Sequence, residues 1–250
     1  MHILVLGAAG MVGRKLVERL LRDGRLGKAD ITRMTLHDVV APDQPARTGF
    51  PVEVAAGDFA VAGAAEKLIA GQPDVIFHLA AIVSGEAELD FDKGYRINLD
   101  GTRMLLDAIR RVGSPYKPRL VFTSSIAVFG APFPEAIGDE FFHTPLLSYG
   151  TQKAIGELLL SDYSRRGFLD GIGVRLPTIC IRPGLPNKGP PASSPTSCAS
   201  RLRARKPSFR FRRTSGIGMP LLARRSASCC MPPRWIFPPS APAATSPCRD

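Results

Sequence analysis

The sequence predicts an α/β fold in which helices cover both faces of a doubly wound parallel sheet. Three observations in residues 1–188 favour this fold: short apolar runs alternate with amphipathic stretches, a glycine-rich turn follows the first run, and two runs are apolar at consecutive positions. Consecutive apolar positions are typical of parallel strands buried on both faces. Alternation with helices is typical of βαβ units.

The elements follow in order along residues 1–188. We expect strands at residues 2–7, 34–37, 52–54, 75–78, 120–123 and 173–180. We expect helices at residues 11–22, 62–70, 97–112 and 149–165, where apolar side chains recur at helical spacing. The runs at 75–78 and 120–123 are the two that should be buried on both faces. Together these elements describe a Rossmann-type domain.

Residues 189–250 have a different composition from residues 1–188. They hold 11 of the 33 Lys and Arg residues but one of the 22 Asp and Glu residues, so they carry +10 of the net charge of +11. They also hold 11 of the 23 prolines, and no helical or strand period extends beyond a few residues. Such a segment cannot easily bury enough apolar area to offset its chain entropy. We therefore expect a domain at 1–188 and a disordered tail at 189–250.

Composition also bears on location and partners. One of the five cysteines, Cys180, precedes residue 189, which fits a reducing compartment without a disulfide framework. The apolar run that begins at Ile3 is too short for a signal peptide, and no stretch approaches the ~18 apolar residues of a membrane span. Prolines interrupt the basic residues of the tail, which argues against a nucleic-acid platform. We expect a cytoplasmic protein with a small-molecule substrate, no nucleic acid and no membrane, and we keep a homodimer as an open alternative.

The glycine-rich turn is the first functional motif. Gly7, Gly10 and Gly13 follow the first expected strand, and Met11 begins the first expected helix. Glycines at this spacing allow a tight turn, a close approach of backbone N–H groups to a pyrophosphate and close packing of helix on strand. The helix N-terminus adds partial positive charge. The motif predicts dinucleotide binding.

Residues that follow later strands should complete the cofactor site. Asp38 ends the second expected strand, where its carboxylate can accept hydrogen bonds from both ribose hydroxyls and would repel a 2′-phosphate, so NAD is favoured over NADP. Asp58 and Phe59 could hold the adenine edge and face. Ala80 is one of the small residues after His78 that would let the cofactor lie close. We interpret His78 itself as a packed histidine rather than a catalytic one.

A serine, a tyrosine and a lysine form the expected catalytic group. Ser125 follows the fifth strand, and Tyr149 and Lys153 lie one helical turn apart on a helix, so their side chains share one face. A phenol with a pKa near 10 is a poor base at neutral pH, and a neighbouring ammonium should lower that pKa. Tyr149 could then take an alcohol proton while hydride leaves the same carbon. Ser125 would hold the substrate oxygen, with Ser124 as the alternative hydroxyl.

These motifs resemble the extended short-chain dehydrogenase/reductase superfamily. Within it, residues 78–88 (HLAAIVSGEAE), 123–130 (TSSIAVFG), 175–178 (RLPT) and 181–184 (IRPG) look like D-erythronate dehydrogenases. The resemblance covers about three quarters of the chain. It implies NAD-dependent oxidation of the C2 hydroxyl of a four-carbon acid sugar, with Tyr149 as proton acceptor, Lys153 as its electrostatic partner and ribose ligand, and Ser125 as substrate ligand. It also implies that Asn98 supports the site.

The tail departs from that resemblance, which implies a small substrate-covering domain after residue 184. A GC-rich spelling of a family-like segment, read one base later, yields ASSPTSCAS, which is residues 192–200. A second segment yields GIGMP, residues 216–220, by the same shift. We therefore expect a frameshift near residues 188–191, with a genuine basic tail as the alternative.

Two other functions remain open at this point. One is a nucleotide-sugar epimerase or dehydratase on the same scaffold. The other is a non-catalytic NAD-binding regulator with a basic tail, although a regulator would have no need of Ser125, Tyr149 and Lys153.

Overall fold

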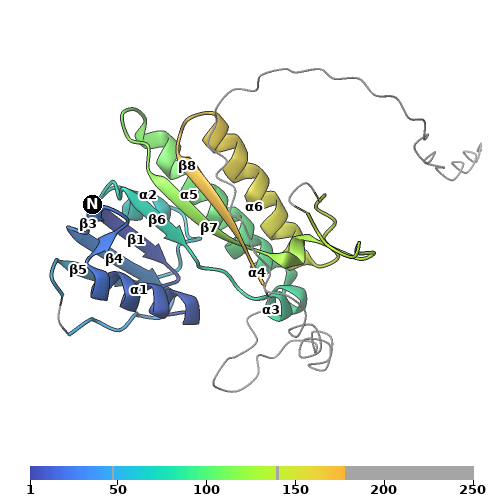
Figure 1. Ribbon diagram of the computed structural model, residues 1–250, viewed down its shortest axis with the longest axis horizontal. Coiled ribbons are helices and arrows are strands. Elements are labelled where there is room, and N and C mark those ends of the chain that lie inside the picture. The colour runs from blue at the N-terminus through green and yellow to red at the C-terminus, as the bar shows by residue number, and fades with distance from the viewer. Residues whose placement is uncertain (47, 139–140, 178–250) are drawn as a thin grey trace, which may run out of the picture. The chain divides into compact units, whose positions relative to one another are not determined.

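A computed structural model describes residues 1–177 apart from residues 47 and 139–140. Within this part, a six-stranded parallel sheet has the order β5-β4-β1-β6-β7-β8 (Figure 1). The strands are β1 (His2–Leu6), β4 (Arg33–Asp38), β5 (Val52–Ala56), β6 (Val75–His78), β7 (Arg119–Ser125) and β8 (Asp170–Leu176). The order reverses direction beside β1, the first strand in sequence, which creates the crevice where ligands bind in such sheets.

Helices lie on both faces of the sheet, as the sequence predicts. They are α1 (Met11–Asp23), α2 (Ala64–Ile69), α3 (Ser84–Leu89), α4 (Phe91–Gly94), the π-helical η1 (Tyr95–Asp100), α5 (Gly101–Val112), the 3-10 turn η2 (Ile126–Val128) and α6 (Ser148–Arg165). A short hairpin of β2 (Arg25–Leu26) and β3 (Ala29–Asp30) follows α1. The Rossmann-type fold is therefore confirmed.

Side chains alternate between two apolar clusters, one on each face. Along β1, Ile3 and Val5 join the cluster that includes Val17 and Leu20 of α1. Leu4 and Leu6 join the other cluster, whose helical members are Ala65 and Ile69 of α2, Leu105, Leu106 and Ile109 of α5, and Leu160 of α6. This alternation follows from the period of two in a strand. Helix α1 thus covers one face, and α2, α5 and α6 cover the other.

The expected boundaries differ from the observed ones at several places. Helix α5 was expected to begin at residue 97, but helical structure starts with α4 at Phe91 and passes through η1. Helix α3 and η2 were not expected, because six-residue and three-residue elements carry too few periods to detect. Strand β8 begins at Asp170, three residues earlier than expected, where Asp170 pairs in register with Arg119 and forms an ion pair with it.

Burial confirms one of the two strands expected to be covered on both faces and corrects the other. All four residues of β6 are buried. In β7, Leu120, Phe122 and Ser124 are buried, whereas Val121 and Thr123 are half-buried. The end of the expected strand at 178–180, the boundary at 188 and the tail at 189–250 lie outside the described residues.

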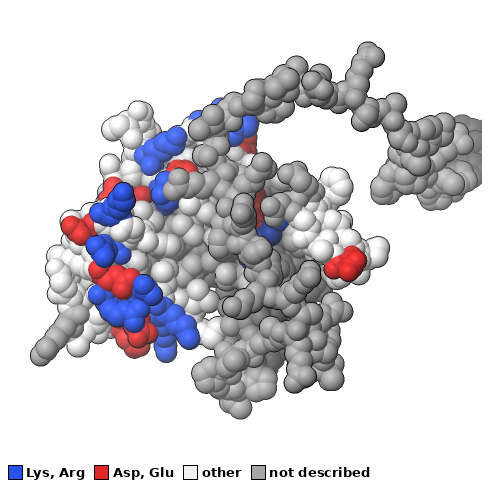
Figure 2. All heavy atoms as spheres, in the orientation of Figure 1, with Lys and Arg blue, Asp and Glu red and all other residues white. Residues whose placement is uncertain are grey.

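Two surface properties concern the expected partners. On the face drawn in Figure 2, Lys and Arg side chains of the described residues are interspersed with Asp and Glu side chains. Within the same part of the chain, every helix falls short of the length or the apolar character that crossing a bilayer requires.

Candidate active site

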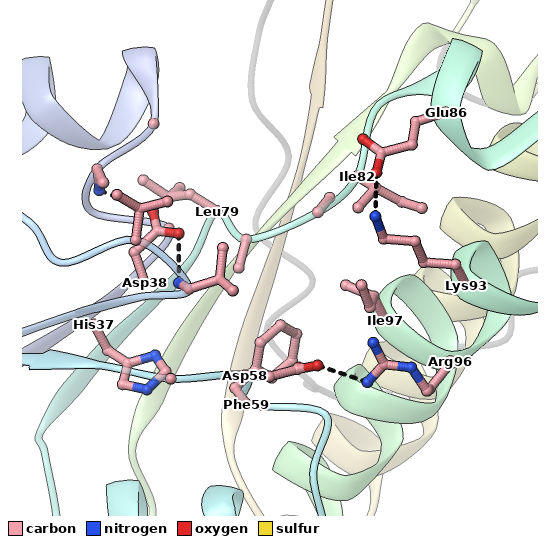
Figure 3. Close-up of a pocket in the computed structure, with 18 of the residues that line it drawn as sticks. His37, Asp38, Asp58, Phe59, Leu79, Ile82, Glu86, Lys93, Arg96 and Ile97 are labelled. Carbon is pink, nitrogen blue, oxygen red and sulfur yellow. Dashed lines mark hydrogen bonds and ion pairs between the residues drawn. The ribbon is translucent and has the colours of Figure 1, made fainter. Parts of the chain in front are cut away.

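A cavity of about 580 Å³ lies at the carboxyl ends of the central strands. Figure 3 shows His37 and Asp38 on one side of it and Glu86, Lys93 and Arg96 on the other. Its walls come from the segments that follow β1, β4, β5 and β6, and from α3, α4 and η1. Five of the predicted cofactor residues line this cavity: Gly7, Gly10, Asp38, Asp58 and Ala80. The predicted catalytic residues Ser125, Tyr149 and Lys153 are not among its lining residues.

The glycines of the turn are needed for two different reasons. A Cβ on Gly7, which has φ +88°, would lie 2.6 Å from the backbone nitrogen of Ala80, and a Cβ on Gly13 would lie 2.1 Å from the carbonyl oxygen of Gly7. These two glycines therefore let α1, β1 and the segment after β6 pack closely. Gly10 is exposed and lines the cavity. The atom nearest to a Cβ added there would be the carbonyl oxygen of Gly7, at 3.3 Å. A side chain there would enter the cavity.

Helix α1 begins at Met11 with its N-terminus unprotected by a side chain. Gly10 occupies the N-cap position and provides no side-chain hydrogen bond. The first N–H groups of the 13-residue helix are therefore available to an anion, and the helix dipole favours negative charge at that point. The small residues, the free helix end and the cavity size fit the diphosphate of a dinucleotide.

Asp38 ends β4 and lines the cavity beside the turn. Its Oδ2 accepts a hydrogen bond of 2.9 Å from the N–H of Ala9, and its Oδ1 accepts one of 2.7 Å from the N–H of Val39. Each carboxylate oxygen has a second lone pair that can accept another donor. The side chain is half-buried, so it fixes the turn and still faces the cavity.

Asp58 and Phe59 also line the cavity, but both have partners in the protein. Asp58 Oδ2 pairs with Arg96 Nη1 at 2.7 Å, and Oδ1 accepts from Ala60 N at 2.9 Å. Burial raises the pKa of Asp58, but the hydrogen bonds and the charge of Arg96 outweigh that effect and hold the pKa below its usual value. The Phe59 ring is buried and packs edge-on against His78, with centroids 5.3 Å apart.

The structure brings Ser125, Tyr149 and Lys153 together at the ends of β7 and the start of α6. Tyr149 is half-buried, and the Ser125 side chain, whose Oγ accepts a hydrogen bond of 3.1 Å from Ala127 N, acts on the phenol to lower its pKa. The Lys153 Nζ lies 5.8 Å from the centroid of the Tyr149 ring. Ser125 is half-buried, whereas the alternative hydroxyl, Ser124, is 2% exposed. Ser125 is therefore the serine of the pair that faces the tyrosine.

The electrostatics of Tyr149 correct one expectation. We expected Lys153 to lower the pKa of Tyr149, but burial raises that pKa above 10.0, and the effect of the Ser125 side chain offsets the rise only in part. The Lys153 ammonium instead donates a hydrogen bond of 2.8 Å to the carbonyl oxygen of Thr123. Burial lowers the pKa of Lys153 itself to about 8.

Asn98 lies in η1 and holds two segments together. Its Oδ1 accepts from Ile82 N at 2.9 Å, and its Nδ2 donates to Ile82 O at 3.2 Å and to Gln152 Oε1 at 2.8 Å. Asn98 therefore connects the segment after β6 to α6, next to Lys153.

His78 is 1% exposed and shares a hydrogen bond of 2.9 Å with Thr102. Burial and the charge of Lys153 lower its pKa to about 3. Both observations agree with a packed histidine.

Three residues near the site escaped the sequence analysis. Gln152 is fully buried and braces Asn98. Glu88 of α3 accepts hydrogen bonds from the N–H groups of Ser148 and Tyr149 at 2.6 and 3.4 Å. Glu157 follows Lys153 by one turn of α6. The sequence holds a signal for Glu157, which is its spacing of four from Lys153. It holds none for Gln152 and Glu88, because their contacts join residues more than 50 positions apart.

Comparison with known proteins identifies the family of this chain. The model of the NAD dependent epimerase/dehydratase family matches residues 3–203. D-erythronate dehydrogenases of Cupriavidus necator and Haemophilus influenzae are 49% and 44% identical, each over 75% of this chain and 58% of the relative. The chain thus spans less than two thirds of the length of these relatives.

Solved structures give the same fold. The nucleoside-diphosphate-sugar epimerase from Agrobacterium tumefaciens is 69% identical, with a TM-score of 0.73 over 75% of this chain and 55% of that chain. The UDP-glucose 4-epimerase from Brucella ovis, solved in complex with NAD, is 30% identical, with a TM-score of 0.57 over 70% of this chain and 51% of that chain. With its glycine turn, its cavity at the strand ends and its Ser-Tyr-Lys group, the chain belongs to the NAD-dependent epimerase/dehydratase family.

Proposed function

We propose that the residues of this chain bind NAD and oxidise the C2 hydroxyl of D-erythronate. The observation that supports the proposal is the meeting of Ser125, Tyr149 and Lys153 where β7 ends and α6 begins. The same domain holds a cavity whose glycine turn and free helix end suit a dinucleotide. The choice of substrate is supported by the relatives that are 49% and 44% identical.

The residues have distinct roles in this proposal. Gly7, Gly10, Gly13 and the N-terminus at Met11 receive the diphosphate, and Asp38 accepts the hydroxyls of the adenosine ribose. Ala80 leaves room for the cofactor, and Asp58 would contact the adenosine while it remains paired with Arg96. The chemistry that NAD supplies when bound is acceptance of hydride from the carbon that carries the hydroxyl.

The proton of the hydroxyl leaves through Tyr149. Ser125 donates to or accepts from the substrate oxygen and holds it against the phenol, and Lys153 orients the ribose and stabilises phenolate. Because burial raises the pKa of Tyr149, the phenol is mostly protonated at neutral pH. Oxidation should therefore become faster as the pH rises above neutral, since the base form of Tyr149 becomes more abundant.

We further propose that this chain turns over D-erythronate poorly. The resemblance implies a substrate-covering domain after residue 184, and residues 189–250 have a composition unlike that of such a domain, with 11 prolines and a charge of +10. Without a cover, the substrate carboxylate would lack partners and water would reach the site of hydride transfer. We attribute the tail to a shift of the reading frame near residues 188–191.

The test compares two proteins: this chain, and a chain whose reading frame is shifted back by one base near codon 189. Production of NADH from D-erythronate should be strong in the restored chain and weak in the present one. Tyr149→Phe in the restored chain should abolish turnover and leave NAD binding nearly unchanged. Retention of more than a few per cent of the rate by Tyr149→Phe would show that another group is the base.

A second candidate is nucleotide-sugar epimerisation, which the 69% identical structure favours by its name. The same restored chain separates the two candidates. A dehydrogenase releases NADH in proportion to product, whereas an epimerase interconverts UDP-glucose and its 4-epimer with no net NADH. Epimerisation without D-erythronate oxidation would replace the first proposal.

A further inference from the structure

Lys153 is a buried cation in surroundings that are mostly uncharged. It is 2% exposed, its Nζ lies 4.7 Å from the centroid of the Phe122 ring, and its hydrogen bond goes to the Thr123 carbonyl. The imidazole of His78 on β6 also faces it and is neutral above acid pH, because its pKa is about 3. A buried ammonium is costly unless an opposite charge lies close. None of these groups carries a negative charge, so the charge that compensates the Lys153 ammonium must come from another residue.

Glu157 lies one turn further along α6, on the same face as Lys153. Its side chain is 13% exposed, so little water screens its charge. Burial lowers the pKa of Lys153, and the charge of Glu157 acts in the opposite direction. Among the described residues, Lys153 forms no ion pair with a carboxylate, so Glu157 acts on it across one turn of α6 and not by direct contact.

The carboxylate of Glu157 is fixed by two other side chains. Arg175 of β8 donates from Nε to Oε1 at 3.0 Å and from Nη2 to Oε2 at 2.7 Å, and His143 Nε2 lies 3.0 Å from Oε2. The Arg175 guanidinium also lies 4.8 Å from the centroid of the Phe129 ring. Burial raises the pKa of Glu157, but the hydrogen bonds and charge of Arg175 outweigh it, so the group is an anion at neutral pH.

Other charged groups that pack against α6 have different partners. Glu88 of α3 accepts from the N–H groups at the start of the helix, next to Tyr149. Lys93 of α4 pairs with Glu86. Asp107 of α5 accepts from the hydroxyl of Tyr163, more than two turns beyond Lys153, and pairs with arginines of its own helix.

We propose that Glu157, held by Arg175 and His143, is the counter-ion of Lys153 and keeps that side chain charged and oriented toward Tyr149. Glu157 is thus a positioning residue that acts through Lys153, and β8 contributes to the active site through Arg175. The inference rests on the role proposed above for Lys153. It concerns a charge inside the protein, however, and can be tested without NAD, substrate or turnover.

The test follows the charge of Lys153 by NMR in the full chain. The chain carries ¹³C-labelled lysine, and the Lys153 side-chain signal is assigned by its loss in Lys153→Met. In the parent, the signal should titrate near pH 8. In Glu157→Gln the midpoint should fall below the parent value, because the favourable charge is gone. Asp107→Asn, which removes another well-bonded carboxylate of low exposure, should leave the midpoint unchanged.

The direction of the shift separates an electrostatic role from a structural one. If Glu157→Gln merely loosened the packing, water would reach Lys153 and its midpoint would rise toward the 10.5 of an exposed lysine. A midpoint that rises or stays unchanged would overturn the proposal. Arg175→Gln removes a positive charge and should shift the midpoint upward, opposite to Glu157→Gln.

A measurement on the unaltered chain covers the case in which Glu157→Gln does not fold. When Glu157 takes up a proton at acid pH, the Lys153 signal should show a second, smaller inflection that lysines elsewhere, such as Lys15, do not share. Absence of that inflection in the folded parent would contradict the proposal. Loss of D-erythronate oxidation in the restored chain would not affect either titration, so the two proposals can fail separately.

Discussion

Charged side chains are partly exposed at the cavity wall and largely buried around α6. At the cavity, Arg96 pairs with Asp58 and Lys93 with Glu86, and the side chains of both pairs are between 28% and 45% exposed. Around α6, Lys153 is buried and Glu157 is 13% exposed, and their partners come from β7, β8 and the segment before α6. Under the proposed function, the contrast teaches that the cavity would hold a charged cofactor with ion pairs left exposed to water. The proposed proton transfer would instead depend on side chains kept away from water.

That contrast predicts where substitutions should be severe. Exposed pairs are screened by solvent and contribute little to stability. Substitutions of buried ionisable groups, or of glycines in close backbone contact, should change stability much more, and the sign depends on whether a charge is removed or a clash is created. The following substitutions test the contrast, beginning with the largest expected effect.

Gly13→Ala should be the most damaging. Its Cβ would lie 2.1 Å from Gly7 O and 2.8 Å from Ala8 Cα, and both are backbone atoms that cannot rotate away. We expect a loss of unfolding free energy of about 3 kcal/mol or more in urea titrations. Gly10→Ala is the matched control, because its added Cβ meets only Gly7 O at 3.3 Å. It should change stability little and weaken NAD binding, and equal destabilisation by both variants would contradict this account.

Lys153→Met should raise stability near neutral pH. Burial holds the pKa of Lys153 at about 8 when folded, against 10.5 for an exposed lysine. Between these values the unfolded chain binds the proton and the folded chain does not, so parent stability should rise from pH 8 to 10.5. The methionine variant should lack this rise and be more stable at pH 7 by roughly 2 to 3 kcal/mol. Unfolding curves at several pH values check this, and an unchanged pH slope would show that the group is not buried.

Asp38→Asn should weaken NAD binding by about tenfold, or about 1.4 kcal/mol, since a neutral amide is a weaker acceptor for ribose hydroxyls. The parent should prefer NAD to NADP, because the carboxylate repels a 2′-phosphate, and the variant should narrow that preference. Calorimetry with both cofactors measures the two effects. Equal binding of NAD and NADP by the parent would contradict the assignment of Asp38 to the cofactor site.

Arg96→Gln should have the smallest effect. It breaks the ion pair with Asp58, whose side chains are 45% and 28% exposed, and such pairs contribute about 0–1 kcal/mol. The difference from the parent should shrink further in high salt. A loss of several kcal/mol in thermal or urea unfolding would mean that the cavity wall depends on this pair far more than its exposure indicates.

Local patterns in the sequence were enough to predict the sheet, the glycine turn and the meeting of Tyr149 with Lys153. Those features depend on residues close in sequence: a period of two in strands and a spacing of four on a helix. The contacts of Asn98 with Gln152 and of Glu88 with Ser148 span 54 and 60 residues, so no local period reveals them. The pKa of Tyr149 was predicted in the wrong direction for the same reason, because burial is a property of the folded chain and not of the spacing.

The position of β1 in the sheet has a consequence for synthesis on the ribosome. The first strand to emerge pairs with β4 on one side and with β6 on the other, so its registers join His2 to Arg33 and Ile3 to Val75. The centre of the sheet therefore cannot close until residue 78 has left the exit tunnel, and the apolar residues of β1 stay uncovered until then. Slow elongation over this stretch would lengthen the period in which the nascent chain needs a chaperone.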